Sequence, residues 1–421
     1  MGLIGGRNNM AQQLNIAVYH NLHSGGAKRT LYEEVRRLAE RHHLDLYALS
    51  SADNDFCDVR PFVNEVRIYD FEPGPLFHSP FGRLNQAVRT RDLRRLREVS
   101  RRVAVDVDAA GYHVVLVHPC QYTQSPLVLQ YLRTPTVYYC QEPLRKLYEL
   151  PVRRPYEHER RSLLRRVLDR IDVLAGFYRA MLRHADRDSL RSASRVLVNS
   201  RFTQENVRRI YGVEAHVCPH GVDTELFRPM GLSRDGTVLS VGALTPNKGF
   251  DFVIEGLGRI PARQRPRLII VSNYAEPRER AYLEQMAAEQ GVAVQFKVDV
   301  DDEALVQVYN RAALVAYAPI REPLGLVPLE AMSCGTPVVG VREGGVAETV
   351  VPGEGGWLTE REPSAFARAI QTLLSDPDLA SQQGQRARQY VLAHWTWDGA
   401  VRELEHHLAA TVARHTGRAE N

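Results

Sequence analysis

Long apolar runs and abundant cysteines are both missing from this 421-residue chain. No stretch approaches the roughly 18 consecutive apolar residues that a membrane-spanning helix needs, so we expect no such helix. The five cysteines are scattered, without a Cys-x-x-Cys pair or a histidine at metal-ligand spacing. This scatter favours reduced thiols in a cytoplasm over a disulfide framework or a zinc site. The polar residues 1–13 contain no apolar core typical of a secretory signal.

Lysine is also scarce, and the charge is distributed unevenly along the chain. The lysines are Lys28, Lys146, Lys248 and Lys297, so arginine supplies most of the positive charge. Up to Gly221 there are 34 Lys and Arg against 24 Asp and Glu, whereas the remainder has 20 against 26. Two interpretations stay open: an anionic partner for the first half, or a general preference for arginine.

The length and the pattern of apolar runs indicate the fold class. A single core rarely exceeds about 250–300 residues, so two domains are expected. Short apolar strands alternate with amphipathic helices almost throughout, which predicts an α/β fold with two doubly wound parallel sheets. Pro and Gly cluster at 219–223. We therefore predict Rossmann-like domains at 14–221 and 222–397, with a final helix over 398–416 that packs back on the first domain.

The first glycine-rich turn contains Gly25 and Gly26, between a predicted strand at 16–19 and a predicted helix at 27–41. Glycines at such a turn let backbone N–H groups approach an anion at the start of the helix. The Gly-x-Gly-x-x-Gly fingerprint of dinucleotide-binding proteins is absent here. A tight turn without a ligand is an equal alternative.

The scarce lysine Lys248 follows a strand predicted at 237–241. We place it in the first turn of the next helix, where the helix dipole disfavours a cation. A cation in that place indicates an anionic ligand that offsets the cost. The alternative is a solvated surface lysine.

Two carboxylates, Glu322 and Glu330, flank the start of a helix predicted at 327–333. The free amides of Gly325 to Val327 would face a ligand there. Carboxylates accept several hydrogen bonds and therefore suit the hydroxyls of a sugar or ribose. In the alternative interpretation Glu330 is a capped, buried acid and Glu322 a loop charge.

Taken together, these segments resemble glycosyltransferase family 4, a large family of retaining enzymes with the GT-B fold that use nucleotide-diphosphate sugars. The resemblance covers about residues 16–408 and rests on the segments Val198–Thr203, Pro219–Asp223, Val241–Gly249, Glu322–Ala331, Gly335–Val339 and Gly344–Gly345. The Glu-x7-Glu spacing in this setting is specific, whereas the first glycine turn is not.

The resemblance implies two facing Rossmann-like domains, with a GDP- or UDP-sugar of mannose or glucose type as the donor between them. It implies no metal and no cofactor besides this donor. The implied catalytic residues are Glu322, Lys248 and Gln141. The implied donor-binding residues are Gly25, Gly26, Lys248, Val298, Glu322, Leu324, Gly325, Leu326 and Glu330, with Glu330 on the ribose and the base near Val298. A front-side attack, in which a donor phosphate oxygen takes the proton of the acceptor hydroxyl, is the usual proposal for this family.

The chain departs from the family pattern at two positions. Ala243 stands where the family often has an arginine on the diphosphate, and Arg29 and Arg321 are candidate substitutes. Gln141 stands where the family often has a histidine near the anomeric centre, and it cannot titrate near neutral pH. His118 is a second candidate for that role, although a structural histidine is the simpler interpretation.

The acceptor is indicated by two Arg-rich segments, 83–102 and 144–170, in which apolar residues alternate with basic ones. Such surfaces suit an anionic membrane or a lipid-linked acceptor, and a solvated helix face is the alternative. Tyr139-Cys140-x-x-Pro143 also resembles mannosyltransferases that act on lipid-linked glycans. We expect a cytoplasmic protein, peripheral at the inner membrane face, without a nucleic-acid partner.

Two rival hypotheses remain at this stage. Another GT-B activity, 2-epimerisation or phosphorolysis, would need its own acid and base residues or a lysine-bound cofactor, and the sequence gives no sign of either. A non-catalytic sugar-nucleotide or membrane-binding protein is favoured only by Ala243 and Gln141.

Overall fold

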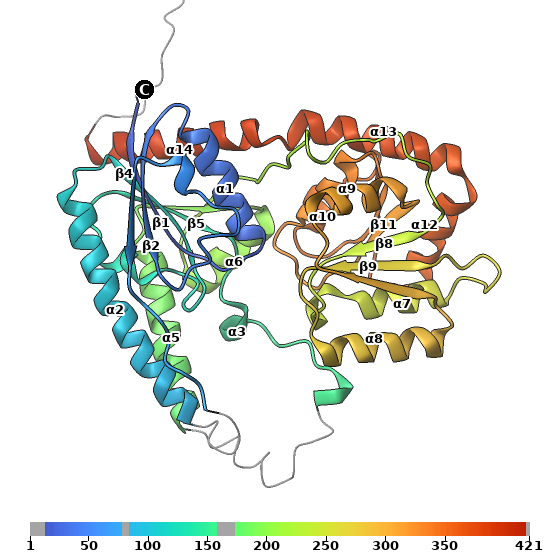
Figure 1. Cartoon of the computed structure of the whole chain (residues 1–421), viewed down its shortest axis with the longest axis horizontal. Helices are drawn as coiled ribbons and strands as arrows, with labels where there is room; N and C mark the ends of the chain where they lie inside the picture. The colour runs from blue at the N-terminus through green and yellow to red at the C-terminus, as the bar shows by residue number, and fades with distance from the viewer. Residues whose placement is uncertain (1–12, 78–83, 158–172, 418–421) are drawn as a thin grey trace, which may run out of the picture. The chain divides into compact units, whose positions relative to one another are not determined.

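A computed structural model describes residues 13–77, 84–157 and 173–417, and the structural statements below refer to these residues. The first sheet has the strand order β3-β2-β1-β4-β5-β6-β7 (Figure 1). Its strands are β1 (Asn15–Asn21), β2 (His43–Leu49), β3 (Glu65–Tyr69), β4 (Val114–Cys120), β5 (Thr136–Cys140), β6 (Arg195–Val198) and β7 (His216–Val217). The helices of this half are α1 (Gly26–Leu38), α2 (Asn85–Ala109), α3 (Arg145–Tyr148), α5 (Val173–Arg191) and α6 (Arg201–Tyr211).

The second sheet has the order β10-β9-β8-β11-β12-β13. Its strands are β8 (Val238–Val241), β9 (Leu268–Ser272), β10 (Val294–Val298), β11 (Leu314–Tyr317), β12 (Val338–Val341) and β13 (Gly356–Thr359). The helices are α7 (Phe250–Gly258), α8 (Pro277–Gln290), α9 (Asp302–Arg311), α10 (Leu326–Ser333), α11 (Val346–Thr349), α12 (Pro363–Ser375), α13 (Pro377–His394) and α14 (Trp397–His415).

Both sheets are built from parallel pairs. In the first sheet β1 pairs in parallel with β2 and with β4, and in the second β8 pairs in parallel with β9 and β11. Strands of this kind are buried on both faces, which explains their continuous apolar runs. The predicted α/β architecture of two doubly wound parallel sheets is therefore confirmed.

The core of the second sheet lies on its two faces (Figure 1). Leu239 and Val241 of β8 belong to a cluster with Tyr309 of α9 and Met332 of α10. Val238 belongs to the other cluster, which contains residues of α7, α8 and α12. Successive side chains of a strand point to opposite faces, so one short strand supplies both clusters. All of the strand ends that carry predicted donor-site residues in this half are thus fixed by a packed core.

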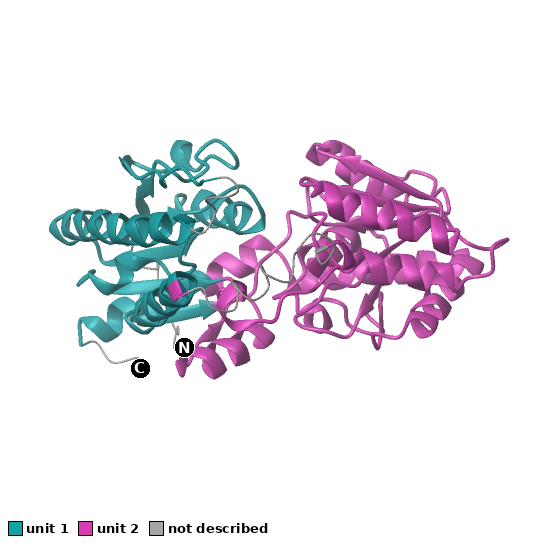
Figure 2. Cartoon of the chain, turned by 90° about the horizontal axis from the view of Figure 1, so that it is seen from below, with its two compact units in different colours: residues 1–140, 174–197, 404–421 teal, residues 141–173, 198–403 magenta. Residues whose placement is uncertain are grey.

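The chain forms two compact units (Figure 2). The first contains residues up to Cys140 together with 174–197 and 404–421, and the second contains 141–173 and 198–403. In the first unit Glu405 of α14 pairs with Arg41 and His42, each at 3.0 Å. The functional domains expected at 14–221 and 222–397 follow a different division, and that boundary stays a prediction.

None of the helices in the described part of the chain combines the length and the hydropathy needed to span a bilayer.

Candidate functional site

Lys248 and Glu322 form an ion pair at the carboxyl edge of the second sheet. The Nζ atom of Lys248 is 2.8 Å from Oε1 of Glu322 and 3.0 Å from Oε2. The two residues are neighbours because they follow β8 and β11, which lie side by side in the sheet. We expected Lys248 in the first turn of a helix, but the structure places it elsewhere. It ends a short 3-10 turn, Pro246–Lys248, and α7 begins after Gly249. The inference of an anionic ligand from a lysine placed against the helix dipole therefore does not apply to Lys248.

The two loops that carry this pair are packed backbone against backbone. The N–H of Ile320 donates to the carbonyl of Asn247 at 2.8 Å. Gly249 has φ 68°, and a Cβ atom on it would lie 1.9 Å from the carbonyl oxygen of Ala318. Only glycine permits so close an approach in this backbone conformation. The distance between Lys248 and Glu322 is consequently set by rigid main chain rather than by flexible side chains alone.

Glu322 is a largely buried carboxylate, with 13% of its side chain exposed, and its neighbours hold its charge. Burial raises the pKa of Glu322, but the ammonium of Lys248, the guanidinium of Arg145 and a hydrogen bond from Tyr317 lower it below its usual value. The pKa of Tyr317 rises in turn, because its hydroxyl is buried and faces this carboxylate. Glu322 is therefore ionised at neutral pH and acts as a hydrogen-bond acceptor.

The Gly344–Gly345 turn supports the Glu322 loop. The N–H of Gly345 donates to the carbonyl of Glu322 at 2.7 Å. A Cβ atom on Gly345 would lie 2.1 Å from the carbonyl oxygen of Pro323. The hydroxyl of Ser200 donates to that same oxygen at 2.5 Å. The contacts of this turn are thus with the backbone of the loop.

The amides at the start of α10 lie next to this loop. Gly325 precedes the helix with φ 102° and makes no side-chain cap. The first amides of a helix have no acceptor within the helix, so the N–H groups of Leu326 and Val327 are available for other acceptors. Pro328 in the same turn has no N–H to present. Leu324 is 3% exposed and packs in the core below, which fixes the loop rather than contacting solvent.

Glu330 lies inside α10, as predicted, and accepts a hydrogen bond from Tyr309 at 2.7 Å. Burial and the Glu330 charge raise the pKa of this tyrosine, which therefore remains a donor. Val298 ends the edge strand β10 and is 40% exposed. An exposed apolar residue at a carboxyl strand end is compatible with stacking against a base.

Gln141 directly follows β5 and is almost completely buried. Its carbonyl accepts from the side-chain amide of Asn199 at 3.0 Å. Its own Nε2 atom is buried and has no hydrogen-bond partner in the described structure. An unsatisfied buried donor is costly, which suits a group that donates to a ligand.

The remaining predicted residues lie in the first unit. Gly25, with φ 143°, precedes α1, and Gly26 is the first residue of that helix. His118 is completely buried, 2.9 Å from Glu34, and stacks on Tyr139. These contacts favour the structural interpretation of His118.

The cysteines and acidic residues are the candidate ligands for a metal. All five cysteines are free, and four of them are buried. The sequence contains Asp-x-Asp triplets at 53–55, 106–108, 186–188, 299–301 and 376–378. Across the described ranges no group of three His, Cys, Asp or Glu side chains is arranged to hold a metal ion.

Several residues of the site had no signal in the sequence. Arg145, Tyr317 and Tyr309 contact or face the two predicted carboxylates. Arg145 is 176 positions from Arg321, the residue before Glu322, and it becomes a neighbour only through the fold. Tyrosine at the end of a strand is too common to mark a ligand site.

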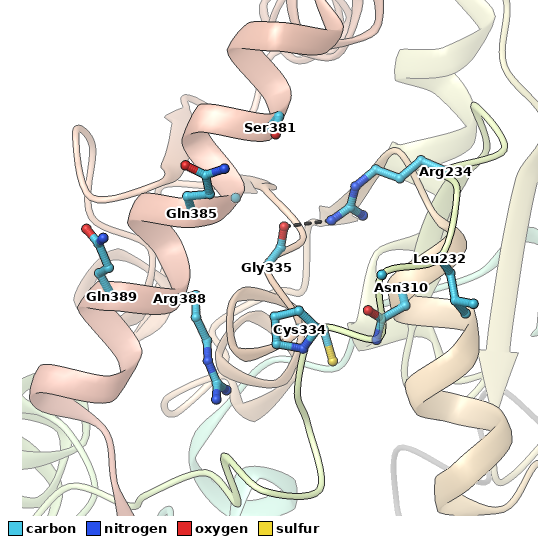
Figure 3. A pocket seen from close by; sticks show the side chains of 12 residues that line it. Leu232, Arg234, Asn310, Cys334, Gly335, Ser381, Gln385, Arg388 and Gln389 are labelled. Atoms are coloured by element: carbon cyan, nitrogen blue, oxygen red, sulfur yellow. Dashed lines mark hydrogen bonds between the residues drawn. The ribbon is translucent and has the colours of Figure 1, made fainter.

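A cavity away from this site lies beside the loop that precedes β12 (Figure 3). Arg234 and Arg388 line it, and both guanidinium groups donate to backbone carbonyls, among them those of Gly335 and Ser333. The dashed line in Figure 3 marks the contact between Arg234 and Gly335. These bonds explain the two arginines as supports of the loops around Cys334.

Comparison with solved structures identifies the fold class of the chain. Among solved structures of similar fold are a sucrose-phosphate synthase from Thermosynechococcus elongatus and Anabaena Alr3699/HepE in complex with UDP and glucose. The first has a TM-score of 0.71 and 22% identity over 97% of this chain and 100% of the other. The second has a TM-score of 0.67 and 20% identity over 94% and 100%. The two doubly wound sheets thus define the GT-B fold.

Family models then cover most of the chain. The model "Glycosyltransferase Family 4" matches residues 24–226, and "Glycosyl transferases group 1" matches residues 223–390. The chain belongs to family 4 of the GT-B glycosyltransferases.

Two curated relatives refine the comparison. The D-inositol 3-phosphate glycosyltransferase of Acidothermus cellulolyticus is 36% identical over 51% of this chain and 53% of its own length. The GDP-mannose-dependent alpha-(1-6)-phosphatidylinositol monomannoside mannosyltransferase of Mycolicibacterium smegmatis is 32% identical over 47% and 57%. The chain spans about half the length of these relatives.

Proposed function

We propose that this chain is a retaining, metal-independent glycosyltransferase that moves a mannose- or glucose-type hexose from a nucleotide-diphosphate sugar to a hydroxyl. One observation carries the proposal: the ion pair of Lys248 and Glu322 beside the free amides of α10. A ligand at this place meets an ammonium and helix amides, which suit phosphates, and a carboxylate, which suits sugar hydroxyls. The nucleotide-diphosphate sugars combine these groups in one molecule.

The remaining site residues divide the donor between them. Glu330, oriented by Tyr309, would accept from the ribose hydroxyls. Val298 would contact the base, and Gln141 would donate from its unsatisfied Nε2 to the sugar. Gly25 and Gly26 would add amides to the diphosphate from the first unit.

The proposed reaction breaks the bond between the anomeric carbon and the diphosphate oxygen, and the electron pair leaves with the diphosphate. The acceptor hydroxyl forms the new bond on the same face, and its proton passes to a phosphate oxygen of the leaving group. Lys248 and the amides of Leu326 and Val327 would stabilise the developing negative charge. Fixed donors of this kind contribute about 3–4 kcal/mol each in closed sites.

The names of the relatives favour a particular type of acceptor. One of them acts on an inositol phosphate and the other on a phosphatidylinositol mannoside, as their names state. We propose a phosphate-bearing or lipid-linked acceptor for this chain as well. The excess of arginine in the first half agrees with such a substrate.

An exposed apolar patch in the first unit favours contact with a membrane. Helices α2 and α5 lie near each other (Figure 1), and burial raises the pKa of Tyr178 in α5 while the charge of Arg89 in α2 opposes this rise. The name apolar patch is used here for the exposed side chains of Leu76, Phe77, Leu84, Leu174 and Phe177, which are 47–55% exposed. Arg89 and Arg91 of α2 are exposed as well. Exposed apolar side chains together with cations suit the surface of an anionic bilayer. Residue 83 and residues 158–170 of the two Arg-rich segments lie outside the described residues.

A thermal-shift panel of UDP-, GDP- and ADP-sugars tests the proposed function. Only a nucleotide that binds the native site should raise the melting temperature. Transfer from that donor should be lost in Glu322→Ala, while the melting temperature without donor stays close to that of the wild type. A rise in melting temperature without transfer of sugar to any acceptor would favour the non-catalytic alternative. Turnover by Glu322→Ala would refute the assignment.

A further inference from the structure

The segment 142–157, here called the crossover segment, follows β5 and lies in the second unit. Its Arg154 is fixed as firmly as a core residue, with a side chain only 4% exposed. The guanidinium donates to Glu279 at 2.8 and 3.1 Å, to Asp251 at 3.1 Å and to the carbonyl of Pro246 at 3.0 Å. The hydroxyl of Tyr156 donates to the same Glu279 at 2.7 Å. The crossover segment is therefore anchored to the loop that contains Lys248.

A second arginine of the crossover segment contacts the loop of Glu322. Arg145 donates from Nη2 to the carbonyl of Arg321 at 2.6 Å and from Nη1 to that of Ile320 at 3.4 Å. Its Nε atom donates to Glu142 at 2.6 Å. The guanidinium thus binds the two carbonyls that immediately precede Glu322.

The backbone at this point needs such support. Arg321 has φ 50°, a conformation that is costly for a residue with a side chain. Its N–H donates to Glu343 at 3.0 Å, and its guanidinium contacts Glu149 and the carbonyl of Leu150. Arg321, one of the candidate substitutes for an arginine at Ala243, is therefore directed to the crossover segment.

The charged and titratable groups that face Glu322 come from four parts of the chain. They are Lys248 in the turn before α7, Arg145 in α3, the hydroxyl of Tyr317 in β11, and Glu142 after β5. Burial raises the pKa of Glu142, and the negative charge of Glu322 raises it further. Burial lowers the pKa of Arg145, but Glu142 and Glu322 raise it above its usual value.

We propose that Arg145 is the positioning residue of Glu322: it fixes the loop and supplies the cation that keeps this carboxylate charged while a donor diphosphate engages Lys248. This inference rests on the proposed function. It also accounts for the absence of an arginine at Ala243, because the positive charge enters the site from the crossover segment. A lysine could supply the charge but could not bond two carbonyls and Glu142 in one plane.

Calorimetric titration of the selected nucleotide-sugar at several pH values tests this role without any acceptor. The variants are Arg145→Gln and Arg145→Lys, with Lys146→Gln as the control, because Lys146 is exposed and adjacent. The guanidinium of Arg145 is one of the groups that lower the pKa of Glu322, so the affinity of Arg145→Gln should fail at a higher pH than that of the wild type. The loss of affinity relative to the wild type should therefore be larger near pH 5 than near pH 8.

The Lys variant should keep the pH profile of the wild type while binding more weakly at every pH. Lys146→Gln should match the wild type throughout. Binding of the nucleotide diphosphate alone near pH 8 reports that each variant is folded with Lys248 in place. A uniform loss at all pH values in Arg145→Gln, or an unchanged profile, overturns the positioning role. If no nucleotide-sugar binds the wild type, the proposed function fails instead, so the two failures are distinct.

Discussion

At the scale of single residues, Lys28 of α1 is a buried amine, with no exposed surface. Its Nζ atom is 3.3 Å from Nε2 of His20, and Nδ1 of the same ring faces the N–H of Leu22 at 3.4 Å. A neutral imidazole has one donor and one acceptor nitrogen, so the direction of its contact with Lys28 depends on the tautomer of His20. Burial lowers the pKa of Lys28 from 10.5 to about 8, although Asp53 and Asp58 oppose the change.

This burial predicts a pH-dependent stability. Between about pH 8 and 10.5 the unfolded chain binds more protons at Lys28 than the folded one, so stability rises with pH across that window. The full shift corresponds to about 3 kcal/mol. Lys28→Met should therefore raise the urea midpoint near pH 7, and the gain should shrink by about pH 9.5. Lys146→Met, at an exposed position, is the control. A gain that is equal at both pH values would contradict the buried amine.

Prediction from sequence was strongest for residues whose chemistry is unusual in its local setting. Lys248 and Glu322 stood out because one is a rare lysine and the other begins a specific spacing. The structure brings their side chains to 2.8 Å, and their roles toward a donor stay predictions. Tyr317 and Arg145 could not be predicted, because their role depends on distances that only the fold creates. The individual roles of Gln141, Val298 and Glu330 stay predictions.

At the scale of the elements, the close approach of two loops is the feature most sensitive to substitution. Gly249→Ala adds a Cβ atom at 1.9 Å from the Ala318 oxygen in a backbone with φ 68°. Gly236 has a similar φ of 71° but nothing within 4 Å of its Cβ position. Both alanine variants bear the backbone cost of about 1 kcal/mol, but only Gly249→Ala must also separate the Lys248 and Glu322 loops. Its donor affinity, measured by calorimetry, should fall at least tenfold more than that of Gly236→Ala. Equal affinities would show that the loop contact does not shape the site.

The elements that the sequence did not predict share a physical reason. β3 pairs at the edge of the first sheet, and its residues are mostly exposed, so the chain carries no continuous apolar run there. The buried residues of α13 are small, with Ala380, Gly384 and Ala387 among them, which gives a weak helical pattern. By contrast, β4 is buried at every position and begins with a continuous apolar run that indicates a strand.

At the scale of the whole molecule, the apolar patch and the positive first half predict salt-dependent binding to membranes. Sedimentation with vesicles of phosphatidylglycerol should retain the protein, whereas phosphatidylcholine vesicles should not, and added salt should release it. The double variant Leu174→Ser and Phe177→Ser should lose most of the binding. Leu392→Ser is the control, because Leu392 is also exposed but lies in the second unit. Retention by both lipids, or no effect of the double variant, would contradict the membrane contact.

The architecture was more predictable than the division of the chain. Alternating strands and helices, spread over 421 residues, predict two doubly wound sheets because no single core accommodates them. The sequence gives no sign that the segment after β5 joins the second unit, since its anchor, Arg154 on Glu279, links residues 125 positions apart. Long-range ion pairs of this kind leave no local pattern.

The central claim is that Lys248 binds the diphosphate and Glu322 the sugar of one donor. The most direct test compares the affinities of the nucleotide-sugar and of its nucleotide diphosphate for the wild type, Lys248→Met and Glu322→Gln, by calorimetry. We expect Lys248→Met to weaken both ligands, because both carry the diphosphate. We expect Glu322→Gln to weaken the nucleotide-sugar at least tenfold and to leave the nucleotide diphosphate nearly unchanged. An equal loss for both ligands in Glu322→Gln, or no loss in either variant, would contradict the account.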